Sequence, residues 1–300
     1  MIEAVQKTLQ QYLADQVQAV ERALDKWTPA ESAEPQSIHT AMRYSLFAGG
    51  KRIRPVLAIA AAEAISDCPA GIEDAAATLE LVHTYSLIHD DLPALDNDDL
   101  RRGRPTCHKV FGEAMAILAG DGLLTLAFEV LSRLPHRSAE QRIHMVQELS
   151  SAAGTVGGMI GGQVQDIEGE GRQPTAALLE TIHKSKTGAL LRASVRIGAI
   201  YAGANAEQLA ALSEYGEHIG LAFQIVDDVL DMEESSEALG KTAGKDQAQQ
   251  KITFPAVYGL ERSRSMAEEE RLAAHRALRI FDDRAERLRQ IADFIVQRRA

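Results

Sequence analysis

The sequence predicts an all-α protein, a single large bundle of about ten long helices. Three observations favour this fold class. Helix-forming residues such as Ala, Leu, Glu, Gln and Arg fill most segments between the nine prolines. Apolar residues recur at three- and four-residue spacing, and runs of alternating Val, Ile and Thr are absent. We therefore expect helices throughout, no strand, and one domain covering residues 1–300.

Polar or glycine-bearing segments divide this helical pattern. They are Thr28–Ser37, Leu134–Ala139, Glu168–Pro174 and Glu233–Gln250. The helices between them reach roughly 15 to 28 residues, which is long for a globular protein.

Composition restricts the partners and the compartment. The net charge of −11 argues against nucleic acids and anionic membranes as partners, so any anionic substrate must be bound by local cations or by metal ions. Two cysteines are too few for a disulfide framework. The N-terminus lacks the pattern of a signal peptide, and apolar runs such as Val56–Ala62 are too short to span a bilayer. We expect a cytoplasmic protein without stable membrane insertion.

The first acidic cluster is the segment HDDLPALDNDD, which begins at His89. Leu79–His89 is predicted as helix, and Pro93 cannot continue it, so Asp90 and Asp91 fall at the helix C-terminal end. Carboxylates are disfavoured at the negative end of a helix dipole and need a cation there. The alternative interpretation is a solvated acidic loop.

A second acidic cluster lies within a predicted helix. Its polar members stand at i, i+3, i+4 and i+7, which places them on one helix face: Gln224, Asp227, Asp228 and Asp231. Their neighbours are apolar, and burying unpaired carboxylates is costly. Coordination of Mg²⁺ compensates this cost, because that ion binds a few carboxylates together with substrate phosphates.

Basic residues cluster in separate places. GGKRIRP carries Lys51 and Arg54 after two glycines and before a helix start, which is typical of an anion site, although a solvated basic turn is the alternative. His83 lies two helical turns before Asp90 and shares its face. The remaining cations near predicted loops or helix ends are Arg101, Arg102, Lys186, Lys241 and Lys245.

Together and in this order, the motifs resemble those of the trans-prenyltransferases, and among them the bacterial farnesyl diphosphate synthases. They are GGKRIRP, DDLPALD with RRGRPT, GGQVQD, KTG, FQIVDDVLD and GK…GKD, from about Ser37 to the end. The resemblance implies helices around a central substrate cavity, a homodimer, and head-to-tail condensation of isopentenyl diphosphate with dimethylallyl and geranyl diphosphate. It also implies about three Mg²⁺ ions per site, which Mn²⁺ can replace.

The resemblance also implies roles for individual residues. Asp90, Asp91 and Asp96 bind metal in the first motif, and Asp227, Asp228 and Asp231 do so in the second. The allylic diphosphate contacts are Arg101, Lys186, Thr187, Gln224 and Lys241. The isopentenyl diphosphate contacts are Lys51, Arg54, His83 and Arg102. Gln163 and Asp166 match a polar pair that lines the cavity. Catalysis depends on Asp90, Asp91, Asp96, Lys186, Asp227 and Lys241, and the departing diphosphate accepts the proton.

Product length is the finer question. In similar enzymes an aromatic residue five positions before the first Asp limits the product to farnesyl diphosphate, and here that residue is Tyr85. On an ideal helix Ser86 lies about 40° from Asp90 and Tyr85 about 140°, so Ser86 is the better-aligned position. Geranylgeranyl and geranyl diphosphate are the alternative products.

Three other functions compete with this hypothesis. A terpene cyclase or head-to-head synthase shares one acidic motif but needs no second diphosphate site. A di-metal carboxylate bundle would use Glu80-x-x-His83 and Glu180-x-x-His183. An inactive regulatory subunit would not require intact acidic motifs.

Overall fold

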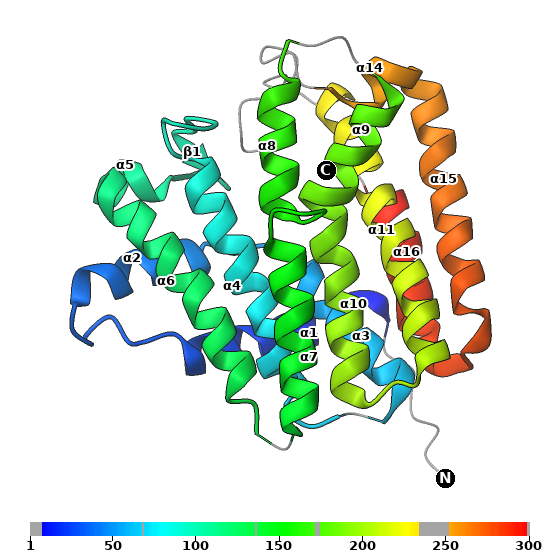
Figure 1. The fold of residues 1–300 in the computed structure, drawn as a ribbon, viewed down its shortest axis with the longest axis horizontal. Helices are drawn as coiled ribbons and strands as arrows, with labels where there is room; N and C mark the ends of the chain where they lie inside the picture. Colours follow the sequence, from blue (N-terminus) through cyan, green and yellow to red (C-terminus); the bar gives the residue numbers. More distant parts are fainter. Residues whose placement is uncertain (1–7, 68, 136, 172–174, 234–251, 299–300) are drawn as a thin grey trace.

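A computed structural model describes residues 8–67, 69–135, 137–171, 175–233 and 252–298. Within these ranges the protein is almost entirely helical, so the predicted fold class is confirmed (Figure 1). Lys241, Lys245 and most of the predicted break Glu233–Gln250 lie outside the described residues.

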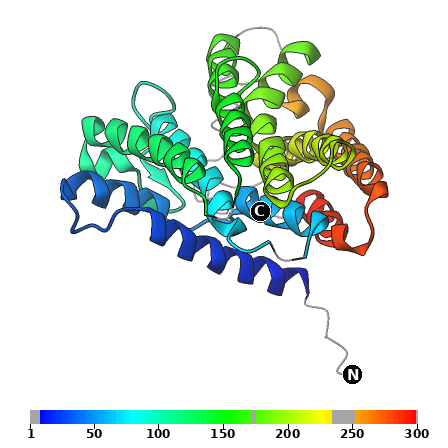
Figure 2. The same ribbon diagram turned by 60° about the horizontal axis from the view of Figure 1, so that its bottom comes forward.

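The first half of the chain forms helices that surround α4. They are α1 (Leu9–Trp27), α2 (Gln36–Leu46), α3 (Ile53–Ile65), α4 (Ile72–Asp90), α5 (Cys107–Phe111) and α6 (Glu113–Ser132). Ten residues of α3 and thirteen of α4 are buried, which is typical of helices at the centre of a bundle. α4 packs against α6, α3, α1 and α10, and Figure 2 shows α1 lying across one side of the bundle.

The second half adds a further layer of helices. They are α7 (Ala139–Ala153), α8 (Met159–Gly169), α9 (Ala176–His183), α10 (Ala189–Ala202), α11 (Ala206–Glu233), α14 (Phe254–Tyr258), α15 (Leu260–Ala277) and α16 (Glu286–Gln297). Two 3₁₀ turns, Leu278–Ile280 and Asp283–Ala285, connect α15 to α16. α9 and α10 are joined by a π-helical turn, Lys184–Gly188. In Figure 1, α8 stands above α7 and α9 above α10.

Local sequence explains several helix boundaries. α1 and α7 begin with capping boxes, in which Thr8 pairs with Gln11 and Ser138 with Gln141. α1 ends before the predicted break at Thr28, and α7 begins at the end of the predicted break at Leu134–Ala139. The breaks at Thr28–Ser37 and Leu134–Ala139 are therefore confirmed to within a residue or two.

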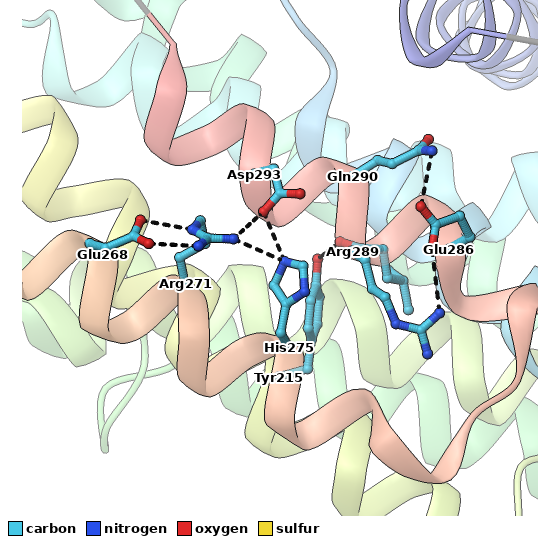
Figure 3. Close-up of polar contacts among 9 residues, drawn as sticks. Tyr215, Glu268, Arg271, His275, Glu286, Arg289, Gln290 and Asp293 are labelled. Atoms are coloured by element: carbon cyan, nitrogen blue, oxygen red, sulfur yellow. Dashed lines mark hydrogen bonds and ion pairs between the residues drawn. The ribbon is translucent and has the colours of Figure 1, made fainter.

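The C-terminal helices are joined by buried and half-buried polar contacts (Figure 3). The hydroxyl of Tyr215 on α11 donates to the Leu288 carbonyl on α16 over 2.8 Å. Asp293 on α16 accepts from Arg271 on α15 and lies 2.8 Å from His275 Nε2. These contacts anchor α16, which ends at Gln297, directly before Arg298.

The expectation that the chain has no strand is wrong at one place. β1 (Leu100–Arg101) and β2 (Arg104–Pro105) pair as a minimal antiparallel ladder after the first acidic cluster. Their two turn residues, Arg102 and Gly103, both have positive φ, as a two-residue hairpin requires. Two residues per strand give no alternating pattern, which is why the sequence did not reveal this hairpin.

α6 is the one described helix long and apolar enough, by length and composition, to cross a membrane. The apolar runs in the sequence did not predict this. α6 packs against α4, α2 and α7 within the bundle, and core helices commonly meet the same criterion.

Candidate active site

A cavity of about 530 Å³ opens between α4, α8, the π turn and α11. Its size is that of a small-molecule site, for which about 300–1,000 Å³ is usual. The polar lining residues are Arg54, His83, Tyr85, Ser86, His89, Asp90, Arg101, Arg102, Gln163, Lys186, Thr187, Gln224 and Asp227. The apolar ones are Leu87, Leu95, Met159, Ile160, Val164, Ile167 and Phe223. Segments far apart in the sequence therefore bring most of the predicted site residues together.

Asp90 is the last residue of α4, as predicted, and its side chain lines the cavity. Burial raises the pKa of Asp90 to about 6, while nearby Lys186 lowers this pKa and the carboxylates of Asp96 and Asp91 raise it. No described side chain makes a hydrogen bond or ion pair with the Asp90 carboxylate. A desolvated carboxylate beside other carboxylates is a favourable place for an added cation.

Asp91 is the C-cap residue of α4, and it does not line the cavity. It is buried and accepts hydrogen bonds from Arg101 Nε at 2.7 Å and 3.0 Å. The backbone after it folds back over the helix end, since the amide of Asp96 donates to the Asp90 carbonyl. Neither Asp91 nor Asp96 is among the residues that line the cavity. Their role as metal ligands stays a prediction.

The second acidic cluster lies on α11, as predicted, but its aspartates face different surroundings. Asp227 lines the cavity and has 51% of its side chain exposed. Asp228 is buried and accepts the amide N–H of Phe254 at 2.9 Å and Gln224 Nε2 at 2.7 Å. Asp231 is half-buried and does not line the cavity. One stripe on the helix therefore contains Asp227, which faces the cavity, and Asp228, which is buried and bonded to the Phe254 backbone.

Arg298 is a site residue that the sequence analysis missed. Its Nη2 donates to Asp227 Oδ1 at 2.7 Å and to the Phe223 carbonyl at 3.1 Å. The guanidinium carbon lies 4.1 Å from the centroid of the Phe223 ring. The only sequence signal is the basic QRRA ending, which gives no indication of this contact.

The three cations around the start of α3 have three different environments. Arg54 lines the cavity, and its Nε is buried without a hydrogen-bond partner among the described residues. Burial lowers the pKa of Arg54, while Glu80 and Asp227 partly restore it. Arg52 is buried and bonded to Glu21 and Glu80, so its role is structural. Lys51 is exposed and does not line the cavity.

His83 and Arg102 line the cavity beside Arg54, as the shared helix face and the hairpin allow. Burial, and then the charges of Arg54 and Arg102, hold the pKa of His83 well below its ordinary value, so this imidazole is neutral at physiological pH. Arg102 donates to the Gly49 carbonyl. A Cβ on Gly50 would lie 2.7 Å from the Arg102 guanidinium, so glycine permits this approach.

The π turn directs Lys186 and Thr187 into the same cavity. Lys186 Nζ lies 2.6 Å from Asp166 Oδ2, and Thr187 Oγ1 donates to Gln224 Oε1 at 2.8 Å. Gln163 also lines the cavity. Of the predicted Gln163 and Asp166 pair, one member faces the cavity and the other pairs with Lys186.

Tyr85 and Ser86 both line the cavity, although an ideal helix points Tyr85 away from Asp90. The Tyr85 ring packs edge-on against His89, with centroids 5.7 Å apart. The Tyr85 hydroxyl is buried and has no hydrogen-bond partner among the described residues, and burial raises its pKa to about 12. The Ser86 hydroxyl donates to the His83 carbonyl at 2.8 Å.

The acidic residues fit a metal ion that is shared with substrate. Within the described ranges, no group of three or more His, Cys, Asp or Glu side chains is arranged to hold an ion alone. Asp90 and Asp227 nevertheless face one cavity, which also contains cations able to bind phosphate. Mg²⁺ commonly binds through one or two carboxylates and completes its coordination with substrate phosphates and water.

The di-metal carboxylate alternative does not fit this geometry. Glu80 is bonded to the buried Arg52, and Glu180 pairs with Lys184 at 3.3 Å with 47% of its side chain exposed. The two predicted Glu-x-x-His pairs therefore do not share one ion site in the described structure.

Comparison with known proteins places this geometry in a family. The profile of the polyprenyl synthetase family matches residues 35–293. A farnesyl diphosphate synthase of Geobacillus stearothermophilus is 46% identical over 98% of this chain and 99% of its own length. Geranylgeranyl pyrophosphate synthase 12 of Arabidopsis thaliana is 48% identical over 90% of this chain and 76% of its own length.

Solved structures agree with this assignment. An FPP/GFPP synthase of Zymomonas mobilis has a TM-score of 0.85 and 36% identity, covering 96% of this chain and 98% of that one. A geranylgeranyl pyrophosphate synthetase of Pyrococcus horikoshii has a TM-score of 0.87 and 30% identity, covering 96% of this chain and 99% of that one.

Proposed function

Because this chain belongs to the polyprenyl synthetase family and is a trans-prenyltransferase, we propose that its product is farnesyl diphosphate. The substrates are isopentenyl diphosphate with dimethylallyl and then geranyl diphosphate. The observation that carries the proposal is the Tyr85 ring, which lines the cavity five residues before Asp90. The relative from Geobacillus stearothermophilus is a farnesyl diphosphate synthase, and its similarity extends over nearly the full length of both chains. It supports the same product length.

The two charged sides of the cavity suit two different diphosphates. Asp90 and Asp227, with Lys186 and Thr187 opposite, bind the allylic diphosphate, for which Mg²⁺ supplies charge neutralisation and Lewis acidity. Arg54 and Arg102 bind the diphosphate of isopentenyl diphosphate, where no metal is needed. Neutral His83 between them donates a hydrogen bond without adding a third positive charge.

Binding the two diphosphates at separate places allows the two substrates to react. The C–O bond of the allylic diphosphate breaks and leaves an allylic carbocation, which the double bond of isopentenyl diphosphate attacks. A proton then leaves the new chain for the departing diphosphate. Lys186 and Thr187 stabilise the departing diphosphate by hydrogen bonds, and Leu87, Ile160 and Val164 exclude water from the carbocation.

The experiment that tests product length is incubation with labelled isopentenyl diphosphate and each allylic primer, with products sized by chromatography. The wild-type protein should accumulate fifteen-carbon diphosphate. Tyr85→Ala should yield chains of twenty or more carbons, because it removes a ring from the cavity. Ser86→Phe should stop mostly at ten carbons, because it adds one. If both variants made only the wild-type product, α4 would not determine chain length.

We also propose a cytoplasmic homodimer in which α6 contacts the partner. Only 39% of the apolar window in α6 is buried, and Ile117 and Leu118 have 45% and 50% of their surface exposed. A second copy of α6 is a suitable cover for such a face. Leu118→Glu should convert the dimer to a monomer in light scattering, whereas Val156→Glu, at a fully exposed position, should not.

A further inference from the structure

The π-helical turn Lys184–Gly188 is the element that directs Lys186 and Thr187 into the cavity. A π turn contains more residues than an α turn, so it rotates side chains relative to the helix that precedes it. Each residue of an α-helix advances by about 100°, and a shift of one residue would therefore turn both side chains out of the cavity. π turns are rare, so neighbouring structure must favour this one.

Two neighbouring helices touch the backbone of the turn directly, and each does so at a glycine. A Cβ on Gly162 of α8 would lie 2.2 Å from the Lys186 amide nitrogen and 2.6 Å from Lys186 Cα. A Cβ on Gly220 of α11 would lie 2.9 Å from Gly188 Cα. These are backbone atoms, so a side chain at Gly162 or Gly220 would have to displace the turn itself.

Each glycine is followed four residues later by a polar anchor for the same turn. Asp166 follows Gly162 on α8 and pairs with Lys186 at 2.6 Å. Gln224 follows Gly220 on α11 and accepts from Thr187 at 2.8 Å. Residues four apart lie on the same helix face, so each helix offers the turn one backbone contact and one side-chain contact.

We propose that Gly162 and Gly220 are positioning residues that hold the π turn, so that Lys186 and Thr187 contact the allylic diphosphate. The inference rests on the proposed function for the identity of the ligand. The three atoms nearest to a Cβ on Gly162 belong to Lys186, and those nearest to a Cβ on Gly220 belong to Gly188. None belongs to Arg54, His83 or Arg102, so we expect isopentenyl diphosphate binding to be independent of these glycines.

The test replaces Gly162 by alanine and measures both substrates. Gly162→Ala should lower kcat/KM for the allylic diphosphate by about tenfold to a hundredfold, because displacement of reacting groups by about 1 Å has effects of this size. The KM for isopentenyl diphosphate should change less than about twofold. Gly220→Ala should give a smaller change in the same direction, because a Cβ at Gly220 would lie farther from the turn than one at Gly162. If Gly162→Ala does not fold, Gly220→Ala provides the test.

Two matched controls separate positioning from general packing. Gly169 lies on the same helix as Gly162, but a Cβ there would meet only ordinary contacts of 3.5–3.8 Å, so Gly169→Ala should behave as wild type. Gly216 lies one turn before Gly220, and a Cβ there would meet Val195 and Arg192 instead of the turn. Gly216→Ala should lower the melting temperature without a selective loss for the allylic substrate.

The outcomes are distinct. A selective allylic defect in Gly162→Ala, with residues 184–188 displaced in its crystal structure, supports the proposal. Wild-type kinetics with an unchanged turn would overturn it, and so would an equal loss for both substrates like that of a packing defect. If the wild-type protein made no prenyl diphosphate, the proposed function would fail, while the crystal structure of Gly162→Ala would still test whether the glycines hold the turn.

Discussion

The two aspartate pairs of the site differ in sequence context but divide their work in the same way. In the first, Asp90 faces the cavity and Asp91 is bonded to Arg101. In the second, Asp227 faces the cavity and Asp228 accepts the Phe254 amide. The cavity-facing members differ: Asp90 is desolvated, whereas Asp227 is half exposed and paired with Arg298. Adjacent acidic residues in a motif therefore have different surroundings.

The largest expected effect is on turnover and concerns the cavity-facing member of each pair. Asp90→Ala and Asp227→Ala should each lower kcat by about a thousandfold or more, because removal of groups that stabilise developing charge has effects of this order. Asp90→Ala should be the more severe, since its carboxylate is the more desolvated. EDTA should abolish activity, and Mg²⁺ or Mn²⁺ should restore it. Near-normal turnover in either variant, with its fold intact by circular dichroism, would contradict the proposal that Asp90 and Asp227 both help to bind the allylic diphosphate.

A similar difference should separate the cations around the start of α3, where Arg54 lines the cavity and Lys51 does not. Arg54→Ala should raise the KM for isopentenyl diphosphate by about tenfold to a hundredfold, as expected for a lost charge-assisted hydrogen bond. Lys51→Ala should raise it by less than about threefold, since Lys51 is exposed and does not line the cavity. Steady-state kinetics with both substrates varied would measure this. A larger effect from Lys51 would mean that this side chain moves into the site when substrate binds.

The buried Asp228 should contribute more to the free energy of unfolding than the half-exposed Asp227. Asp228→Ala leaves the buried Phe254 amide without its acceptor and should lower the free energy of unfolding by about 2 kcal/mol. Asp227→Ala should change it by less than about 1 kcal/mol, because that carboxylate is half exposed. Urea denaturation would compare them. Equal destabilisation would remove the proposed distinction within the pair.

The smallest expected effect concerns Arg298. Since Arg298 is bonded to Asp227 where a metal would bind, Arg298→Gln should lower the Mg²⁺ concentration for half-maximal activity by about two- to fivefold. Arg133→Gln removes an exposed ion pair with Glu129 on α6 and serves as the control, with no change expected. An increased requirement for Mg²⁺ in Arg298→Gln would show that Arg298 assists metal binding.

The sequence predicts those parts of the site that are local in the chain. Pro93 and the apolar periodicity before it correctly place Asp90 and Asp91 at the end of a helix. The spacing of Gln224 and Asp227 correctly places both on one helix. What separates Asp227 from Asp228 is the Phe254 amide, which is distant in sequence, and no periodicity encodes it.

Most parts of the site that sequence reasoning missed depend on contacts between distant segments. Arg298 reaches Asp227 only because α16 is anchored to α11 and α15 (Figure 3). The π turn needs glycines from α8 and α11, and the KTG motif alone indicates only a helix end or a loop. The hairpin at Arg102 is too short for an alternating pattern. For Arg298 and the π turn, a tertiary contact that is absent from any sequence window determines the local geometry, whereas the hairpin is local but gives no sequence pattern.

One close contact on α6 has a consequence for how this protein can evolve. His89, whose ring packs against Tyr85, lies so near α6 that a Cβ on Gly120 would be 2.2 Å from His89 Nε2. A side chain at position 120 would displace His89 and remove the support of Tyr85. If Tyr85 limits product length as proposed, substitutions on α6 can therefore change which products form, although α6 lines no part of the cavity. The exposed residues of α6 are the proposed dimer contact, so selection for assembly and selection for product length act on neighbouring residues of one helix.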